Sequence, residues 1–160
     1  MSTRGIYGFR KNNVDKTSYN HSDSYPSGLG AQVVEFFADA DLVKLGEVFD
    51  SIQLVKDDDI VTEDIAENIP VEFQRQLCNG GQKTFYNYLR NAQGDLSVYL
   101  KGLKYMIDNH DFIKNSLFCE WGYIVNLDTG KLEVWEGYQK SPTKGNRYGT
   151  THDKDGYYPC

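Results

Sequence analysis

The sequence has little of what metal centres and disulfide-bonded scaffolds are built from. It contains 3 Cys and 3 His in 160 residues, and Cys78, Cys119 and Cys160 are widely separated. No Cys-x-x-Cys or His-x-x-x-His spacing occurs, which argues against a metal site. Because the cysteines are odd in number and dispersed, we expect them to be free thiols in a reducing compartment.

Long apolar runs and an excess of positive charge are also missing. No apolar run approaches the length of a membrane span, and the N-terminus shows no apolar core of signal-peptide length, so we expect a cytoplasmic protein without a membrane partner. The net charge of -6 disfavours binding to nucleic acid, which needs a basic surface. Neither Gly-x-Gly-x-x-Gly nor Gly-Lys-Ser/Thr is present, and no cofactor is expected.

The composition is nevertheless that of a folded protein. Hydrophobic residues make up 39% and aromatic residues 14% of the chain, with 12 Tyr and 8 Phe. This content is sufficient for one domain over residues 1–160 with a substantial core. Tyrosine suits half-buried sheet faces, pocket walls and interfaces, so the composition also permits a homo-oligomer.

Two hairpins are predicted near the ends of the chain. Gly5–Arg10 is rich in strand formers, and Asn12 and Asn13 favour a tight turn before a second strand over Val14–Asn20. A second pair of strands is predicted over 117–127 and 132–136, around the turn Asp128-Thr129-Gly130.

Helices are predicted between the hairpins. The apolar spacing and capping residues predict five segments, which are 29–38, 41–51, 70–77, 82–92 and a helix capped by Asp95 that reaches Met106. The acidic stretch 56–67 is interpreted as solvated, and the tail beyond Ser141 as a long loop or frayed terminus. We therefore expect an α+β fold, in which both hairpins form one antiparallel sheet and the helices cover one face.

A dense polar cluster follows the first hairpin. It runs from Asn20 to Ser24 and is closed by Pro26, Gly28 and Gly30. If Met1 is removed, Ser2 becomes a hydroxyl nucleophile beside a free α-amine, which can act as a base near neutral pH. Closing the hairpin at Asn12-Asn13 returns Asn20 and Asp23 to the start of the chain. The sequence therefore predicts a catalytic group made of Ser2, Asp23 and Asn20.

The segments Ser2-Thr3-Arg4-Gly5 and 20–28 together resemble the opening of N-terminal nucleophile hydrolases, such as amidotransferases and bile-salt-type amidases. The resemblance implies an amidohydrolase acting on a small amide, with Ser2 as nucleophile and Asp23 orienting the α-amine. It also implies an oxyanion donor, for which Asn126 on the later hairpin is the candidate. The same opening is similar to that of uncharacterised bacteriophage and mobile-element proteins, which implies a setting but no activity.

Other interpretations of these residues remain open. Ser, Asn and Asp also cap helices and tie turns, so the cluster is equally typical of a structural loop. A triad of His21, Ser22 and Asp23 is disfavoured because triads assemble from distant positions. The competing functional hypothesis is a non-catalytic protein that binds a small anionic or nucleotide-like ligand, or blocks a host protein. The residues expected around such a ligand are Arg4, Arg10, Tyr19, Asn20, His21 and Tyr25.

Overall fold

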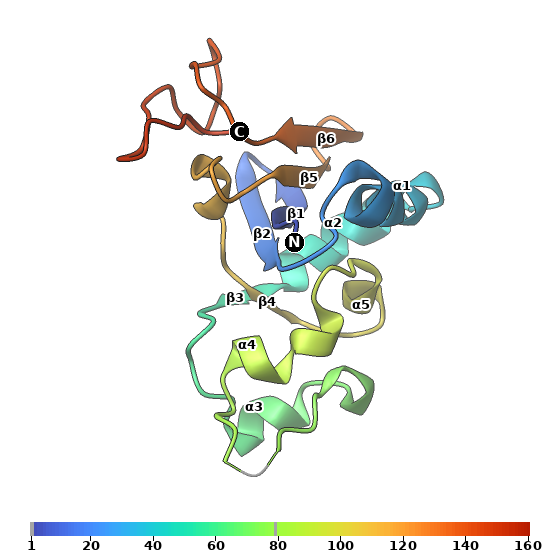
Figure 1. Ribbon diagram of the computed structural model, residues 1–160. Helices are drawn as coiled ribbons and strands as arrows, with labels where there is room; N and C mark the ends of the chain where they lie inside the picture. The colour runs from blue at the N-terminus through green and yellow to red at the C-terminus, as the bar shows by residue number, and fades with distance from the viewer. Residues whose placement is uncertain (1, 79) are drawn as a thin grey trace.

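The structure is a computed structural model that describes residues 2–78 and 80–160 (Figure 1). The predicted removal of Met1 falls on a residue outside that description. The fold is α+β, as expected, and its main sheet has the strand order β2-β1-β5-β6. Its strands are β1 (Gly5–Lys11), β2 (Val14–Asn20), β5 (Trp121–Asn126) and β6 (Lys131–Glu136).

Both hairpins form because their turns contain residues that tolerate left-handed backbone. Asn12 and Asn13 have φ values of 50° and 61°, as the tight turn between β1 and β2 requires. The carboxylate of Asp128 in the second turn accepts hydrogen bonds from the backbone N–H groups of Asn12 (2.8 Å) and Asn13 (3.1 Å). The two turns are thereby fastened to each other at one end of the sheet.

The sheet is mixed, which corrects the prediction of a wholly antiparallel one. Strands β1 and β5 are parallel neighbours, with Gly5 opposite Trp121 and Arg10 opposite Asn126. Parallel neighbours require a long crossover, and the hundred-odd residues between the hairpins provide it. Each hairpin is antiparallel within itself, so only the junction between the hairpins differs from the prediction.

Helices cover one face of this sheet. The helices α1 (Ala31–Ala38), α2 (Leu42–Ser51) and α5 (Ser97–Leu100) lie on the side to which Tyr7 and Phe9 of β1 point (Figure 1). Helix α2 begins as predicted, because the Asp41 carboxylate accepts hydrogen bonds from Val43 N (2.9 Å) and Lys44 N (3.3 Å).

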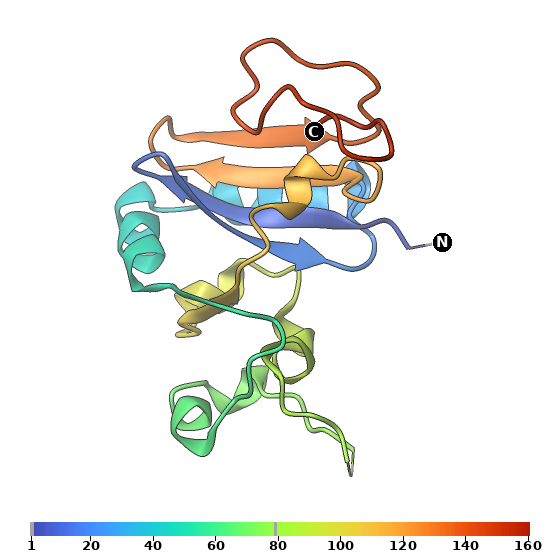
Figure 2. The same ribbon diagram turned by 90° about the vertical axis from the view of Figure 1, so that its left-hand side faces the viewer.

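Irregular chain covers the opposite face. Ile6 and Ile124 point to this side and form a second, smaller core with Ile113, Cys119 and Cys160. A 3-10 turn at Phe112–Lys114 and the segment 141–160 lie over it (Figure 2). The tail has no helix or strand, as predicted, but hydrogen bonds from Cys160 N to Ile113 O (3.1 Å) and from Tyr158 N to Gln139 O (2.9 Å) hold it in place.

The middle of the chain is less helical than predicted. The helix predicted over 70–77 is a 3-10 turn at Val71–Phe73, and the helix predicted over 82–92 is α4 (Phe85–Tyr88) followed by a 3-10 turn at Arg90–Ala92. Within the acidic stretch lies the short helix α3 (Glu63–Glu67). These segments extend away from the main sheet beyond β2 (Figure 2).

The helix predicted from Asp95 to Met106 is also wrong. Helix α5 stops at Leu100, because Gly102 takes a left-handed φ of 104° that ends it. Met106 lies instead in β4 (Tyr105–Ile107), which pairs in parallel with β3 (Gln53–Val55). Leu96, Tyr99, Leu103 and Met106 are all buried, so the apolar pattern identified core residues but not their secondary structure.

Candidate functional site

The polar loop after β2 is tied down by its own side chains. Asn20 is buried, and its amide Nδ2 donates to the backbone oxygen of Ser22 (2.6 Å) and to Ser24 Oγ (2.9 Å). Ser24 is fully buried, and its backbone oxygen accepts from the Tyr123 hydroxyl at 2.9 Å. Asn20 and Ser24 therefore act as the structural ties that were one interpretation of this cluster.

The start of the chain lies beside this loop, as the folding back of the first hairpin predicts. Thr3 O accepts a hydrogen bond from Ser24 N at 3.1 Å, and the half-buried Ser2 hydroxyl donates to the backbone oxygen of His21. Arg4 is half-buried with its guanidinium carbon 5.7 Å from the centre of the Phe118 ring. Ser2 and Arg4 thus both lie at the same end of the sheet as the loop.

Asp23 and Tyr25 are exposed at the outer side of the loop. Asp23 has a left-handed φ of 55°, and its backbone oxygen accepts from Leu29 N at 2.8 Å. This close turn requires Gly28, since a Cβ there would lie 2.2 Å from Asp23 O. The Tyr25 side chain is 40% exposed, so both residues face solvent rather than a recess.

Asn126 is not brought together with the other predicted site residues. It pairs with Arg10, whereas Gly5 pairs with Asn20, so the two asparagines lie at opposite ends of β1. Five residues of strand separate these ends by about 16 Å. The Asn126 side chain accepts hydrogen bonds from Asp128 N (3.0 Å) and Thr129 N (3.2 Å), so it ties the turn between β5 and β6.

The structure shows a cleft that sequence reasoning missed. It has a volume of about 250 Å³ and lies along the outer edge of β2. Its walls come from β2, the acidic loop, α4, the chain after α4, the end of β4 and the segment after β4. The lining residues are Ser18, Tyr19, Asp57, Tyr86, Gln93, Ile107, Asn109 and Phe112. No local motif marks these residues, because they are dispersed over almost a hundred positions of the sequence.

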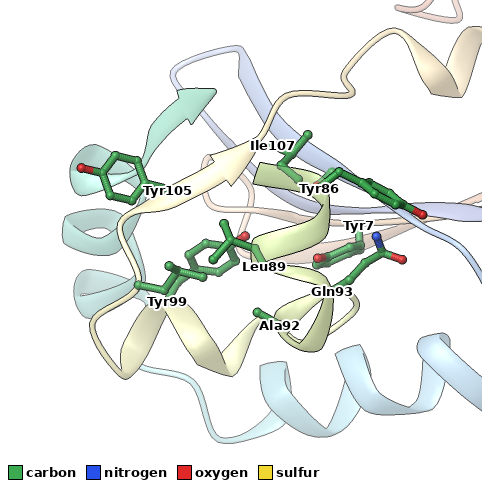
Figure 3. A pocket seen from close by; sticks show the side chains of 10 residues that line it. Tyr7, Tyr86, Leu89, Ala92, Gln93, Tyr99, Tyr105 and Ile107 are labelled. Atoms are coloured by element: carbon green, nitrogen blue, oxygen red, sulfur yellow. The ribbon is translucent and has the colours of Figure 1, made fainter. Parts of the chain in front are cut away.

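The cleft continues inward into a small cavity with aromatic walls. This cavity shares Ser18, Tyr86, Gln93 and Ile107 with the cleft and has a volume of about 20 Å³, room for about one water molecule. Figure 3 shows Tyr7, Tyr99 and Tyr105 among the side chains around it. Burial raises the pKa of Tyr7 to about 12, so this hydroxyl stays protonated at neutral pH.

Positive side chains gather at the end of the cleft nearest the polar loop. The Gln93 side-chain oxygen accepts hydrogen bonds from His21 N (2.9 Å) and Arg90 Nη1 (2.8 Å), which places that guanidinium beside the loop. The Tyr19 hydroxyl lies 2.8 Å from His21 Nδ1. Burial raises the pKa of Tyr19, and the positive charges of Arg4 and Arg90 oppose that rise.

Several polar groups of the cleft have no partner among the described residues. Asn109 Oδ1 accepts from Tyr19 N at 3.0 Å, which leaves its amide Nδ2 without a hydrogen bond. The Gln93 amide nitrogen and the Tyr86 hydroxyl are likewise unbonded to the described chain, and the Asp57 carboxylate is exposed. These groups are available to a ligand.

The described residues contain no cluster of three metal-binding side chains. None of the described helices combines the length and the apolar character needed to cross a membrane. No protein-family model matches this chain, and no curated protein or solved structure is similar to it.

Proposed function

We propose that this chain is a non-catalytic binding protein whose ligand combines a planar aromatic ring with an anionic group. The ring occupies the cleft between Tyr86 and Phe112, and the anionic group lies at the end formed by Arg90 and Arg4. This proposal keeps the small anionic ligand that the sequence suggested. The proposed site differs from the predicted one, because it lies in the cleft rather than at the exposed polar loop after β2.

The walls and size of the cleft support the aromatic part of the ligand. The Tyr19 and Phe112 rings meet edge to face with centroids 5.2 Å apart, which fixes one wall. The half-buried Tyr86 ring forms another wall, and the Arg90 guanidinium carbon lies over it, 5.8 Å from the centre of the ring. The volume of about 250 Å³ is slightly below the range of about 300–1,000 Å³ that is typical of pockets for small molecules, so it suits a ligand with only one or two rings.

The arginines that lack a carboxylate partner support the proposal of an anionic group on the ligand. Arg10 and Arg147 form ion pairs with Asp15 and Glu133, whereas Arg4 and Arg90 form none within residues 2–78 and 80–160. The charges of Arg4 and Arg90 both act on Tyr19, which lines the cleft, whereas Arg75, which also forms no ion pair within the described residues, lines a different hollow. Guanidinium groups bind phosphate and carboxylate through paired hydrogen bonds, so this end of the cleft suits such a group.

Calorimetric titration with phenyl phosphate and adenosine monophosphate tests this proposal. The matched probes are inorganic phosphate, phenol and adenosine, each of which lacks either the ring or the charge. At least one of the two anionic ring compounds is expected to bind about tenfold more tightly than its matched probes, a difference of about 1.4 kcal/mol. Binding of neither compound, or the failure of both to bind more tightly than their matched probes, contradicts the proposal.

Two substitutions locate the ligand within the cleft. Arg90→Met is expected to weaken binding of the anionic compound about tenfold while leaving its neutral counterpart unchanged. Tyr86→Ala is expected to weaken both, because it removes a stacking face. Arg75→Met is the control, since Arg75 is exposed in a different surface hollow. Equal effects of Arg75→Met and Arg90→Met argue against this location.

The nearness of Thr3 to Ser24 supports a second proposal, an amidohydrolase that uses Ser2 as its nucleophile. It requires a free α-amine on Ser2, which the intact mass of the purified protein reports directly. With that amine present, a hydroxyl-directed electrophile is expected to label the protein but not a Ser2→Ala variant. Retention of Met1, or equal labelling of both proteins, rules out this activity. Ser2→Ala is expected to leave ligand binding in the cleft intact.

A further inference from the structure

Two thiols are buried together on the sheet face opposite the helices. Cys119 has none of its surface exposed and Cys160 only 6%, and both belong to the small core around Ile6, Ile113 and Ile124. The Cys160 thiol donates a hydrogen bond to the backbone oxygen of Cys119 at 3.4 Å. Residues 41 positions apart in the sequence therefore bring their sulfur atoms to the same apolar site.

Each of these cysteines belongs to a different part of the molecule. Cys119 precedes β5, and its backbone N–H donates to Asn115 O at 2.8 Å. Gly137, after β6, packs so closely that a Cβ there would lie 2.1 Å from Cys119 O, so this position is fixed by the sheet. Cys160 ends the irregular segment 141–160, where its backbone N–H donates to Ile113 O in the 3-10 turn and its backbone oxygen accepts from Asn146 Nδ2 within the same segment. A bond between the two sulfurs would fasten that segment to the sheet.

We propose that Cys119 and Cys160 form a reversible disulfide, made by exchange with a low-molecular-weight disulfide such as oxidised glutathione, that locks the segment 141–160 over the sheet. In the first step, the thiolate of Cys160 attacks the glutathione disulfide, forms a mixed disulfide and releases one glutathione thiolate. In the second step, the thiolate of Cys119 attacks the Cys160 sulfur and releases the other. The two cysteine protons end on the two glutathione thiols, and glutathione disulfide is the species reduced.

The order of these steps follows from the surroundings of the two thiols. The pKa of Cys119 is raised well above its ordinary value by its contact with the Cys160 thiol and by burial, so Cys119 stays protonated in the closed state. Cys160 lies on the segment without helix or strand, which gains access to solvent when it lifts from the sheet. Cys160 is therefore the first thiol to react, and Cys119 resolves the mixed disulfide.

Cys78 provides an internal reference because it is exposed, whereas the other two cysteines are buried. In the full-length Cys78→Ser protein, incubation with oxidised glutathione is expected to lower the intact mass by two hydrogen atoms. The product is expected to resist alkylation and to revert with dithiothreitol. With Cys119→Ser or Cys160→Ser added, this loss of mass is expected to disappear.

Limited trypsin digestion then measures whether the disulfide holds the segment. Cleavage after Lys144, Arg147 and Lys154 requires local opening, and we expect it to be about tenfold slower in the oxidised Cys78→Ser protein than in the reduced one. Cleavage after Lys101, which follows α5 on the other face of the sheet, is the control and is expected to stay unchanged. A stable glutathione adduct, a disulfide-linked dimer, unreacted thiols or equal cleavage of the two forms each overturns the proposal.

Discussion

The two faces of the main sheet are covered in different ways. The face of Tyr7, Phe9 and Tyr123 is packed by helices and joins a core of more than twenty buried side chains. Among the described residues, the face of Ile6 and Ile124 has a hydrophobic cluster of five buried side chains, and its cover is a 3-10 turn and the irregular segment 141–160. The same strands therefore support one face that regular structure secures and another that depends on side-chain contacts and loop hydrogen bonds.

The two covers differ in the interactions that hold them against the sheet. Helices satisfy their own backbone groups, so the helical face needs only apolar packing to stay closed. The irregular cover relies on specific ties, such as the two hydrogen bonds of 2.6 Å between Arg147 and Glu133 and the bond of 2.6 Å from the Tyr148 hydroxyl to Asp15. We therefore expect the second face to open at a lower free energy than the first.

The largest effect is expected from truncating one buried residue on each face of the sheet. Phe9 is fully buried and meets Phe36 and Tyr99 edge to face, each at 6.3 Å, so Phe9→Ala is expected to lower the free energy of unfolding by about 3–5 kcal/mol. Ile124→Ala on the other face is expected to cost about 2 kcal/mol, because irregular chain can move into the cavity.

Urea unfolding at neutral pH measures both variants, and the exposed Val14→Ala serves as control. Equal losses for Phe9→Ala and Ile124→Ala contradict the proposed difference between the faces.

A smaller effect is expected at alkaline pH and belongs to the helical face. Burial raises the pKa of Tyr7 to about 12, above the value of about 10 in an unfolded chain. A raised folded-state pKa contributes stability that is complete below pH 10 and is lost as the pH rises toward 12. The loss due to Tyr7 is about 2–3 kcal/mol.

Tyr7→Phe is therefore expected to make the free energy of unfolding less dependent on pH between 10 and 12. Denaturation by urea across that range measures the slope, with the exposed Tyr25→Phe as the matched control. A slope that Tyr7→Phe leaves unchanged contradicts the assignment of this effect to Tyr7. Tyr123, whose pKa burial also raises to about 12, supplies part of the remaining slope.

The smallest effect is expected from the ion pairs that hold the irregular cover. Arg147 lies 2.6 Å from Glu133 and 3.6 Å from Asp15, and its guanidinium carbon is 5.0 Å from the centre of the Trp135 ring. Because these groups are partly exposed, Arg147→Ala is expected to cost only about 1 kcal/mol in unfolding free energy, and less at high salt.

Hydrogen exchange is the sharper measurement, since loss of Arg147 is expected to speed exchange at Tyr158 N–H and Cys160 N–H. Exchange within β1, on which the helical face is built, is expected to stay unchanged. Lys144→Ala is the control, because Lys144 is exposed and forms no ion pair within the described residues. Equal exchange in Arg147→Ala and the unaltered protein contradicts the role given to these ties.

The features that the sequence determined are those with a local physical cause. Asn12 and Asn13 required a tight turn because they tolerate left-handed backbone, and Asp41 specified the start of α2 by capping it. The α+β class and the folding back of Asn20 toward Ser2 followed from these signals. Local signals also misled, because Leu96, Tyr99, Leu103 and Met106 have helical spacing although Gly102 ends the helix between them.

Only the tertiary structure decided which distant segments became neighbours. The parallel pairing of β1 with β5, the cleft formed by Tyr19, Tyr86 and Phe112, and the meeting of Cys119 with Cys160 all join segments far apart in the sequence. Such contacts depend on the burial of apolar surface summed over the whole chain, which no short pattern encodes. Turns and caps were therefore determined by the sequence locally, whereas the candidate site was determined by the fold.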